Sequence, residues 1–184
     1  MGVLISGRGS NMMSLVEAAR DPACPYEIAL VASDKPDAPG LSFARDHGIS
    51  TFALSPKGIG KPAYEAEIDR ALRDADVEVV ALAGYMRLLS DEFVVRWRGR
   101  ILNIHPSLLP EYKGLNTHAR AIQAGDAEAG CSVHVVTEEL DAGEVLGQAR
   151  VPILPGDTAE SLAARVLVEE HRLYPTTLAE FVKR

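Results

Sequence analysis

The chain has 184 residues, 47% of them hydrophobic, which is enough for one domain with a buried core and leaves no room for a second. Its 19 basic and 26 acidic residues give a net charge of -7, which argues against nucleic acid or an anionic membrane as the main partner. The two cysteines, Cys24 and Cys131, lie far apart and outside any CxxC motif or His/Cys cluster, so we expect no disulfide, no zinc site and a protein of the reducing cytoplasm.

Short apolar segments alternate with amphipathic ones from the start of the chain, which is typical of parallel strands joined by helical crossovers. Gly48 follows one of the helical segments and is a usual C-terminal stop, because glycine readily adopts the left-handed conformation. In chain order, the pattern predicts a strand at 3–6, a helix at 11–20, a strand at 27–33, a helix at 39–47 and a strand at 49–54.

Residues 7–11 (GRGSN) join the first predicted strand to the first predicted helix. Glycine there lets backbone N–H groups approach a ligand, and a helix N-terminus favours an anion. Met12 replaces the third glycine of a dinucleotide fingerprint, and the segment is not a Walker A loop. The sequence therefore indicates a site for a phosphate-sized anion, although a tight turn capped by Ser10 or Asn11 explains the same residues equally well.

Residues 55–62 (SPKGIGKP) have the glycine and proline density of a mobile surface loop. The loop superficially resembles a phosphate loop, but Pro62 replaces the Ser or Thr that must follow the lysine. A helix is predicted at 63–74, and a strand covered on both faces at 77–83. The apolar run at 77–86 is too short to span a membrane and contains Glu78.

A strand end marked by Gly84 leads into the apolar segment 86–89 (MRLL). A loop of this kind can offer backbone N–H and C=O groups to a flat heterocycle while its side chains form an apolar slot. The plainer alternative is the start of a helix with packing residues. Ser90 fits the N-cap of a helix over 90–98.

Asn103 and His105 fall where a strand-like segment, 99–104, meets a loop that begins at Pro106. Open α/β sheets place their chemistry at such strand ends, and residues two apart on an extended chain face the same side. Both side chains can therefore address one reacting atom. Taken alone, however, an asparagine at a strand end often caps a turn, and a lone histidine is more often structural than catalytic.

Asp141 follows His105 by 36 residues, in the run EELDAG. An amide donor, an imidazole and a carboxylate are the groups needed to stabilise an oxyanion and move a proton in acyl transfer. Asp141 could instead cap the turn before Ala142 and Gly143.

The rest of the chain predicts a helix at 117–124, an antiparallel pair of strands at 131–137 and 145–151, and a long helix from Thr158. Together with the earlier elements, these predict a three-layer α/β sandwich with a mixed, mainly parallel Rossmann-like sheet.

The chain resembles the folate-dependent formyltransferases over nearly its whole length. The similarity is carried by ordered motifs at 6–11, 82–89, 103–110, 132–137, 140–143 and 169–175. Within the family it is most similar to the members that formylate glycinamide ribonucleotide in purine synthesis. The resemblance implies the formyltransferase fold as a single domain over 1–184, 10-formyltetrahydrofolate as formyl donor, no metal, and a monomer or homodimer that acts on small molecules.

The resemblance also implies a role for particular side chains. The start of the first predicted helix would hold the ribonucleotide phosphate, Glu170 would hold the substrate amine, and Lys61 would lie near the glutamate tail of the folate. Residues assigned in this way are Gly9, Ser10 and Asn11 for phosphate, and Met86, Arg87, Leu88, Leu89, Asn103, Ala142 and Gly143 for the pterin. One position departs from the family, which commonly has a histidine where this chain has Asn116.

Formyl transfer to an amine passes through a tetrahedral adduct, with negative charge growing on the formyl oxygen. Asn103 offers N–H donors to that charge, and protonated His105 can stabilise it and help to move a proton. A carboxylate beside His105 favours the imidazolium form, which is the role we assign to Asp141. We expect His134, two residues after Ser132 on an alternating strand, to be a packed neighbour of this site.

The sequence leaves several other classes of protein open. A methionyl-tRNA formyltransferase is expected to carry a further C-terminal domain and more basic character, and a formyltetrahydrofolate hydrolase an N-terminal regulatory domain. A sugar-nucleotide formyltransferase fits less well, because the glycine loop at residues 7–11 favours a terminal phosphate. From another class, a non-catalytic nucleotide-binding module would keep the sheet and the phosphate loop but has no reason to place Asn103, His105 and Asp141 together.

Overall fold

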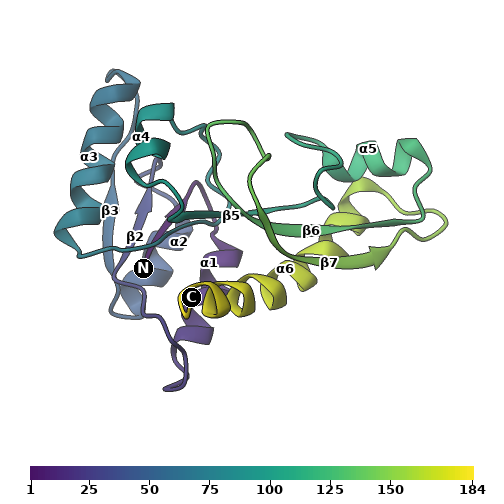
Figure 1. Ribbon diagram of the computed structural model, residues 1–184, viewed down its shortest axis with the longest axis horizontal. Coiled ribbons are helices and arrows are strands. Elements are labelled where there is room, and N and C mark those ends of the chain that lie inside the picture. The colour runs from purple at the N-terminus through teal and green to yellow at the C-terminus, as the bar shows by residue number, and fades with distance from the viewer.

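A seven-stranded sheet runs through the molecule in the order β3-β2-β1-β4-β5-β6-β7, as seen in the computed structural model of residues 1–184 (Figure 1). The first five strands in this order are parallel, and β6 and β7 add two antiparallel strands at one end. The strands are β1 (Gly2–Ile5), β2 (Leu30–Ser33), β3 (Ser50–Ala53), β4 (Val80–Leu82), β5 (Ile101–His105), β6 (Glu128–Val135) and β7 (Val145–Pro152).

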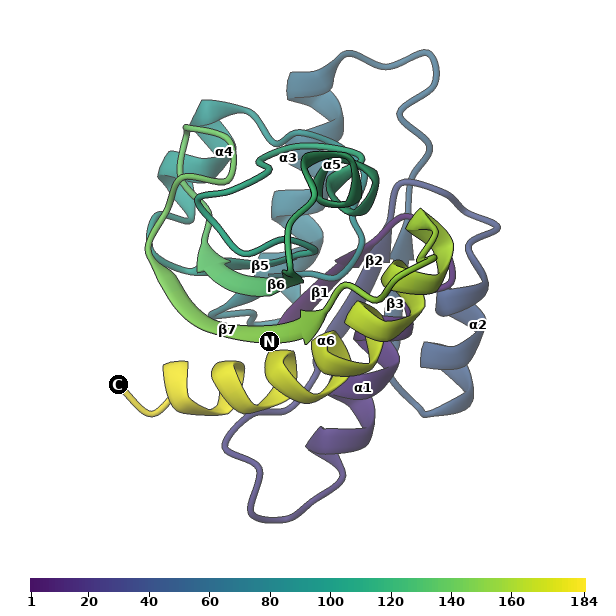
Figure 2. The ribbon, with the colours of Figure 1, turned by 90° about the vertical axis from the view of Figure 1, so that its right-hand side faces the viewer.

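Helices cover both faces of this sheet (Figures 1 and 2). Helices α1 (Ser10–Ala19), α2 (Pro39–Asp46) and α6 (Ala159–Phe181) share one apolar cluster, and α3 (Lys61–Asp74) and α4 (Asp91–Arg96) share the other. Strand β1 supplies both clusters, with Val3 and Ile5 on one face and Leu4 on the other, as the twofold period of a strand requires. The three-layer sandwich with a mixed, mainly parallel sheet is thus confirmed.

The predicted elements are all present, and they differ from the prediction mainly at their ends. The strand predicted at 27–33 begins at Leu30, and the strand predicted at 77–83 is confined to Val80–Leu82. Lys61 and Pro62, which we expected in a loop, begin α3. Proline is accepted in the first turn of a helix because the N–H that it lacks would have no partner inside the helix.

Two helix ends follow the predicted chemistry. The Ser90 hydroxyl accepts a hydrogen bond from the Phe93 N–H and caps α4. Gly48 closes α2 with a φ of 72°. The remaining helix, α5 (Thr117–Ala124), leads into β6. No helix of the molecule combines the length and the apolar character needed to cross a bilayer.

The carboxyl ends of β1, β4 and β5 lie next to one another, because β4 is hydrogen-bonded between the other two strands. The segments that leave these three ends contain the glycine loop, the Met86 segment and His105 respectively. This edge of an open α/β sheet is where ligands bind. The topology therefore brings three of the predicted motifs to one place.

Candidate active site

Strand β5 places Asn103 and His105 on the same face of the sheet, as the spacing predicts. In the antiparallel register with β6, Asn103 is paired with His134 and His105 with Ser132. The Asn103 amide nitrogen Nδ2 lies 3.2 Å from Nε2 of His134. The His105 side chain is only 7% exposed, so its ring is held inside the protein rather than free in solvent.

Asp141 reaches the same cluster from the loop between β6 and β7. Its Oδ2 lies 3.5 Å from Nδ1 of His105, and its Oδ1 lies 3.5 Å from Nε2 of His134. Oδ2 also accepts a hydrogen bond of 2.9 Å from the Gly114 N–H. The structure thus brings together the amide, imidazole and carboxylate that the sequence singled out, and His134 packs against them as expected.

The electrostatics of this cluster keep Asp141 ionised. Burial by itself raises the pKa of its carboxyl, but the contacts from His134 and the Gly114 N–H, together with the positive charge available on His105 and His134, hold that pKa below its ordinary value. A carboxylate fixed between two imidazoles can balance a proton on either ring. The arrangement is therefore suited to acid–base chemistry.

Ser132 is a residue of the site that the sequence reasoning did not assign. Its hydroxyl donates to the Ser107 carbonyl at 2.7 Å and accepts from the Leu109 N–H at 3.0 Å. These bonds hold the loop that follows His105 against β6. Its position two residues before His134 on an alternating strand, at the start of the family-like motif 132–137, was the signal in the sequence that pointed to it.

The glycine loop lines a pocket of about 240 Å³ together with the segment that leaves β4. Gly9 is the N-cap of α1 and has a φ of 71°, and no side chain caps the helix. The first N–H groups of a helix have no partner inside it, so they can face an anion in this pocket. The residues that line the pocket are Ser6, Gly7, Arg8, Gly9, Ser10, Asn11, Ala83, Gly84 and Met86.

Asn11 and Glu170 meet across the interface between α1 and α6. The Asn11 Nδ2 donates to Glu170 Oε2 at 2.6 Å, although 159 residues separate the two in sequence. Burial raises the pKa of the Glu170 carboxyl, and the hydrogen bond from Asn11 lowers it by a smaller amount. The Nδ2 of Asn11 is therefore engaged by Glu170, which leaves the backbone N–H groups of the loop available to an anion.

The segment after β4 forms an exposed apolar surface beside this pocket. Met86 and Leu88 are each 69% exposed, and the Met86 N–H donates to the Ser6 hydroxyl at 2.8 Å. That bond joins the segment to the glycine loop. The Arg87 guanidinium lies over the ring of Tyr64, 5.2 Å from its centre, so it stays close to the protein surface.

The remaining predicted positions lie around the cluster or outside it. Gly143 is tightly enclosed, because a Cβ there would lie 1.8 Å from the Val135 carbonyl oxygen. Asn116 adopts a left-handed conformation with a φ of 58° at the start of α5, and its side chain does not cap the helix. Lys61 is exposed at the start of α3 and is not part of the cluster. No group of three or more His, Cys, Asp or Glu side chains is arranged to hold a metal ion.

The chain has many similar proteins among known sequences and structures. It matches the model of the formyl transferase family over residues 1–178. A phosphoribosylglycinamide formyltransferase of Escherichia coli is 45% identical over 180 residues, which are 97% of this chain and 85% of that protein. A solved phosphoribosylglycinamide formyltransferase from Brucella melitensis is 53% identical, with a TM-score of 0.94, and the alignment covers 98% of this chain and 94% of that one.

Some relatives are much longer than this chain. The trifunctional purine biosynthetic protein adenosine-3 of Drosophila melanogaster is 46% identical over 185 residues, which are 99% of this chain. The match spans only 14% of that protein.

Proposed function

The chain belongs to the formyl transferase family, and on that premise we propose that it transfers the formyl group of 10-formyltetrahydrofolate to the amine of glycinamide ribonucleotide. The products are formylglycinamide ribonucleotide and tetrahydrofolate, in de novo purine synthesis. The observation that carries the proposal is the cluster of Asn103, His105 and Asp141 beside an anion pocket at the carboxyl edge of the sheet. We assign residues 1–184 to one catalytic domain.

Binding of the ribonucleotide is assigned to the glycine loop and α6. Backbone N–H groups at Gly9, Ser10 and Asn11 would hold the phosphate, because the pocket there is lined by an uncapped helix start. Glu170 would hold the substrate amine. The hydrogen bond from the Asn11 side chain already fixes the position of this carboxylate. The group that would bind the amine is therefore in direct contact with a residue of the loop that would bind the phosphate.

Binding of the folate is assigned to the segment Met86–Leu89 and the loop at Ala142 and Gly143. The exposed Met86 and Leu88 side chains offer apolar surface to the pterin, and backbone groups at the strand end offer hydrogen bonds. Lys61 remains assigned to the glutamate tail of the folate. These assignments rest on the resemblance together with the exposure of the side chains.

Transfer begins when the substrate amine attacks the formyl carbon. A tetrahedral adduct forms, and its oxygen carries negative charge that the Asn103 amide and the protonated His105 ring stabilise. The bond from carbon to the folate nitrogen then breaks, while the attacking amine loses a proton and the leaving nitrogen gains one. Asp141, 3.5 Å from His105, balances the positive charge of the ring throughout these steps.

We also propose a cytoplasmic enzyme that acts on small molecules, as a monomer or homodimer. Both cysteines are free thiols, and burial raises the pKa of Cys131 to about 12, so this thiol stays protonated. A net charge of -7 does not suit a nucleic-acid surface.

The direct test is a spectroscopic assay of tetrahydrofolate release with 10-formyltetrahydrofolate and glycinamide ribonucleotide. We expect turnover that depends on both substrates and on His105. Turnover with an amino-sugar nucleotide in place of glycinamide ribonucleotide, and none with the latter, would refute the proposed acceptor while keeping the reaction class.

A further inference from the structure

The His105 ring is oriented by a backbone carbonyl on the side away from Asp141. Its Nε2 lies 3.0 Å from the carbonyl oxygen of Tyr112. A carbonyl can only accept a hydrogen bond, so Nε2 must carry the proton of this contact. The opposite edge of the ring, Nδ1, faces Asp141 and the side of the cluster where Asn103 lies.

Tyr112 holds a backbone conformation that its side chain does not favour. Its φ is 54°, in the left-handed region, where a residue with a Cβ persists only when its surroundings hold it. The conformation matters because it aims the Tyr112 carbonyl at His105. Something other than the local preference of the chain must therefore keep it in place.

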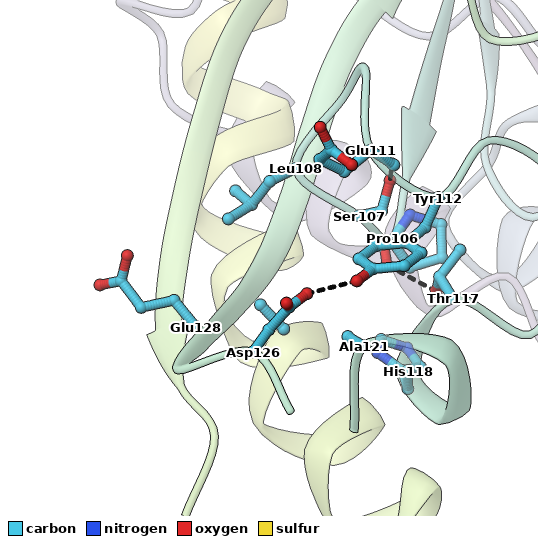
Figure 3. Close-up of a pocket in the computed structure, with 11 residues that line it drawn as sticks. Pro106, Ser107, Leu108, Glu111, Tyr112, Thr117, His118, Ala121, Asp126 and Glu128 are labelled. Atoms are coloured by element: carbon cyan, nitrogen blue, oxygen red, sulfur yellow. Dashed lines mark hydrogen bonds between the residues drawn. The ribbon is translucent and has the colours of Figure 1, made fainter. Parts of the chain in front are cut away.

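Two contacts of the Tyr112 side chain supply that restraint. Its hydroxyl donates to Oδ2 of Asp126, just beyond α5, and both side chains line a small cavity (Figure 3). The guanidinium of Arg120 lies 5.2 Å from the centre of the Tyr112 ring and also donates to the Lys113 carbonyl at 2.7 Å. The hydrogen bond to Asp126 raises the pKa of the Tyr112 phenol, so the hydroxyl remains a donor near neutral pH.

We propose that Tyr112 is a positioning residue for formyl transfer, which fixes His105 through its carbonyl and is itself held by the bond between its hydroxyl and Asp126. An imidazole can present either nitrogen to a partner by rotating its ring. With Nε2 bound to the Tyr112 carbonyl, only Nδ1 is left to face Asp141 and the reacting centre. The catalytic consequence rests on the proposed function, whereas the orientation of the ring does not.

A merely structural role for the same pair predicts a different result. The Tyr112–Asp126 bond would then fasten the segment between β5 and β6, and its loss would lower stability without changing the state of His105. The Tyr112 hydroxyl does not touch the His105 ring. Only a positioning role therefore predicts that removal of this hydroxyl changes the state of the ring nitrogens. The test must therefore observe the ring directly as well as the rate.

The experiment compares Tyr112→Phe, Asp126→Ala and the double variant with the wild-type chain. We expect the 15N shifts of the His105 ring to lose the signature of a fixed Nε2–H donor, and kcat to fall about tenfold, within the roughly 10²-fold that a misplacement of about 1 Å can cost. The KM of each substrate should stay within about twofold. The double variant should be no worse than either single one, because both break one bond.

Two further variants exclude a general loss of stability. Asp126→Asn keeps an oxygen that can accept from Tyr112, so it should recover most of the rate lost in Asp126→Ala. Asp157→Asn is the matched control, because Asp157 is tied to Arg165 at 2.7 Å near the start of α6 and is no part of the active site. In this variant, the 15N shifts of the His105 ring and the kcat should equal those of the wild type.

Unchanged His105 ring shifts in Tyr112→Phe would overturn the inference, whatever the rate. A loss of kcat that merely follows the melting temperature in all variants, Asp157→Asn included, would also overturn it. An inactive wild-type protein would instead count against the proposed function. The ring shifts of Tyr112→Phe and Asp126→Ala would still decide whether Tyr112 positions His105.

Discussion

Replacing Asp141 by Asn removes the charge that faces His105 and leaves almost everything else in place. Asp141 has a φ of 47°, and asparagine tolerates this left-handed conformation better than other residues with a side chain. The amide oxygen of Asn can still accept the Gly114 N–H that now binds Asp141 at 2.9 Å. The substitution therefore tests the charge rather than the loop.

The size of the effect follows from the geometry. Two unit charges separated by the 3.5 Å between Asp141 Oδ2 and His105 Nδ1 attract by about 5 kcal/mol at an effective dielectric constant of about 20. His134 and the Gly114 N–H share the same carboxylate, so we take about half of this energy as the loss felt by protonated His105. A loss of about 2.5 kcal/mol in the transition state corresponds to a kcat lowered roughly 70-fold.

The assay is steady-state formyl transfer with each substrate varied in turn. We expect kcat to carry the loss, with both KM values nearly unchanged, because the charge acts on the proton donor and not on binding. Asp157→Asn makes the same chemical change at a carboxylate bound by Arg165 and should retain wild-type kcat. A folded Asp141→Asn protein whose kcat lies within about threefold of wild type would falsify the electrostatic role of Asp141.

His105→Ala should lower kcat by roughly 10²–10⁴ in the same assay, since it deletes the proton donor and an oxyanion contact. Burial raises the pKa of Glu170, so its ionisation costs stability as the pH rises through that raised value. Glu170→Gln keeps an acceptor for Asn11 and should therefore have a higher melting temperature than wild type at pH 8. This difference should vanish below the ordinary pKa of 4.5. The same variant should bind the ribonucleotide about tenfold more weakly. Gly7→Val should weaken ribonucleotide binding and leave the melting temperature unchanged, because Gly7 lines the pocket and a Cβ there meets no atom within 4 Å. Gly9→Val, at a φ of 71°, should lower both the ribonucleotide affinity and the melting temperature.

Each of these predictions has a contrary outcome. Near wild-type turnover in His105→Ala would remove that ring from the mechanism. A Glu170→Gln protein that melts lower at pH 8 would mean that the charge is stabilised by more than Asn11. Calorimetry with each ligand decides the last case: selective loss of folate binding in Gly7→Val would mean that the glycine loop binds the folate and not the ribonucleotide.

The sequence by itself determined the parts of this protein that depend on residues close together in the chain. The alternation of apolar and amphipathic segments predicted the parallel order of strands and helices, because side-chain period and strand length are local properties. Ser90 was predicted as a cap, and it caps α4, because the bond spans only three residues. Asn103 and His105 were predicted to share a face because they sit two residues apart on one strand.

Only the tertiary structure decided which distant groups touch. Asp141 faces His105 because the register of β6 on β5 and the loop after β6 bring it there, whereas the sequence alone left a turn cap as an alternative. The side chain of Asn11 donates to Glu170, which lies 159 residues away, and nothing in the residues around either position indicated this contact. Such contacts depend on how separate elements pack, and no preference of a residue for its neighbours in the chain encodes them.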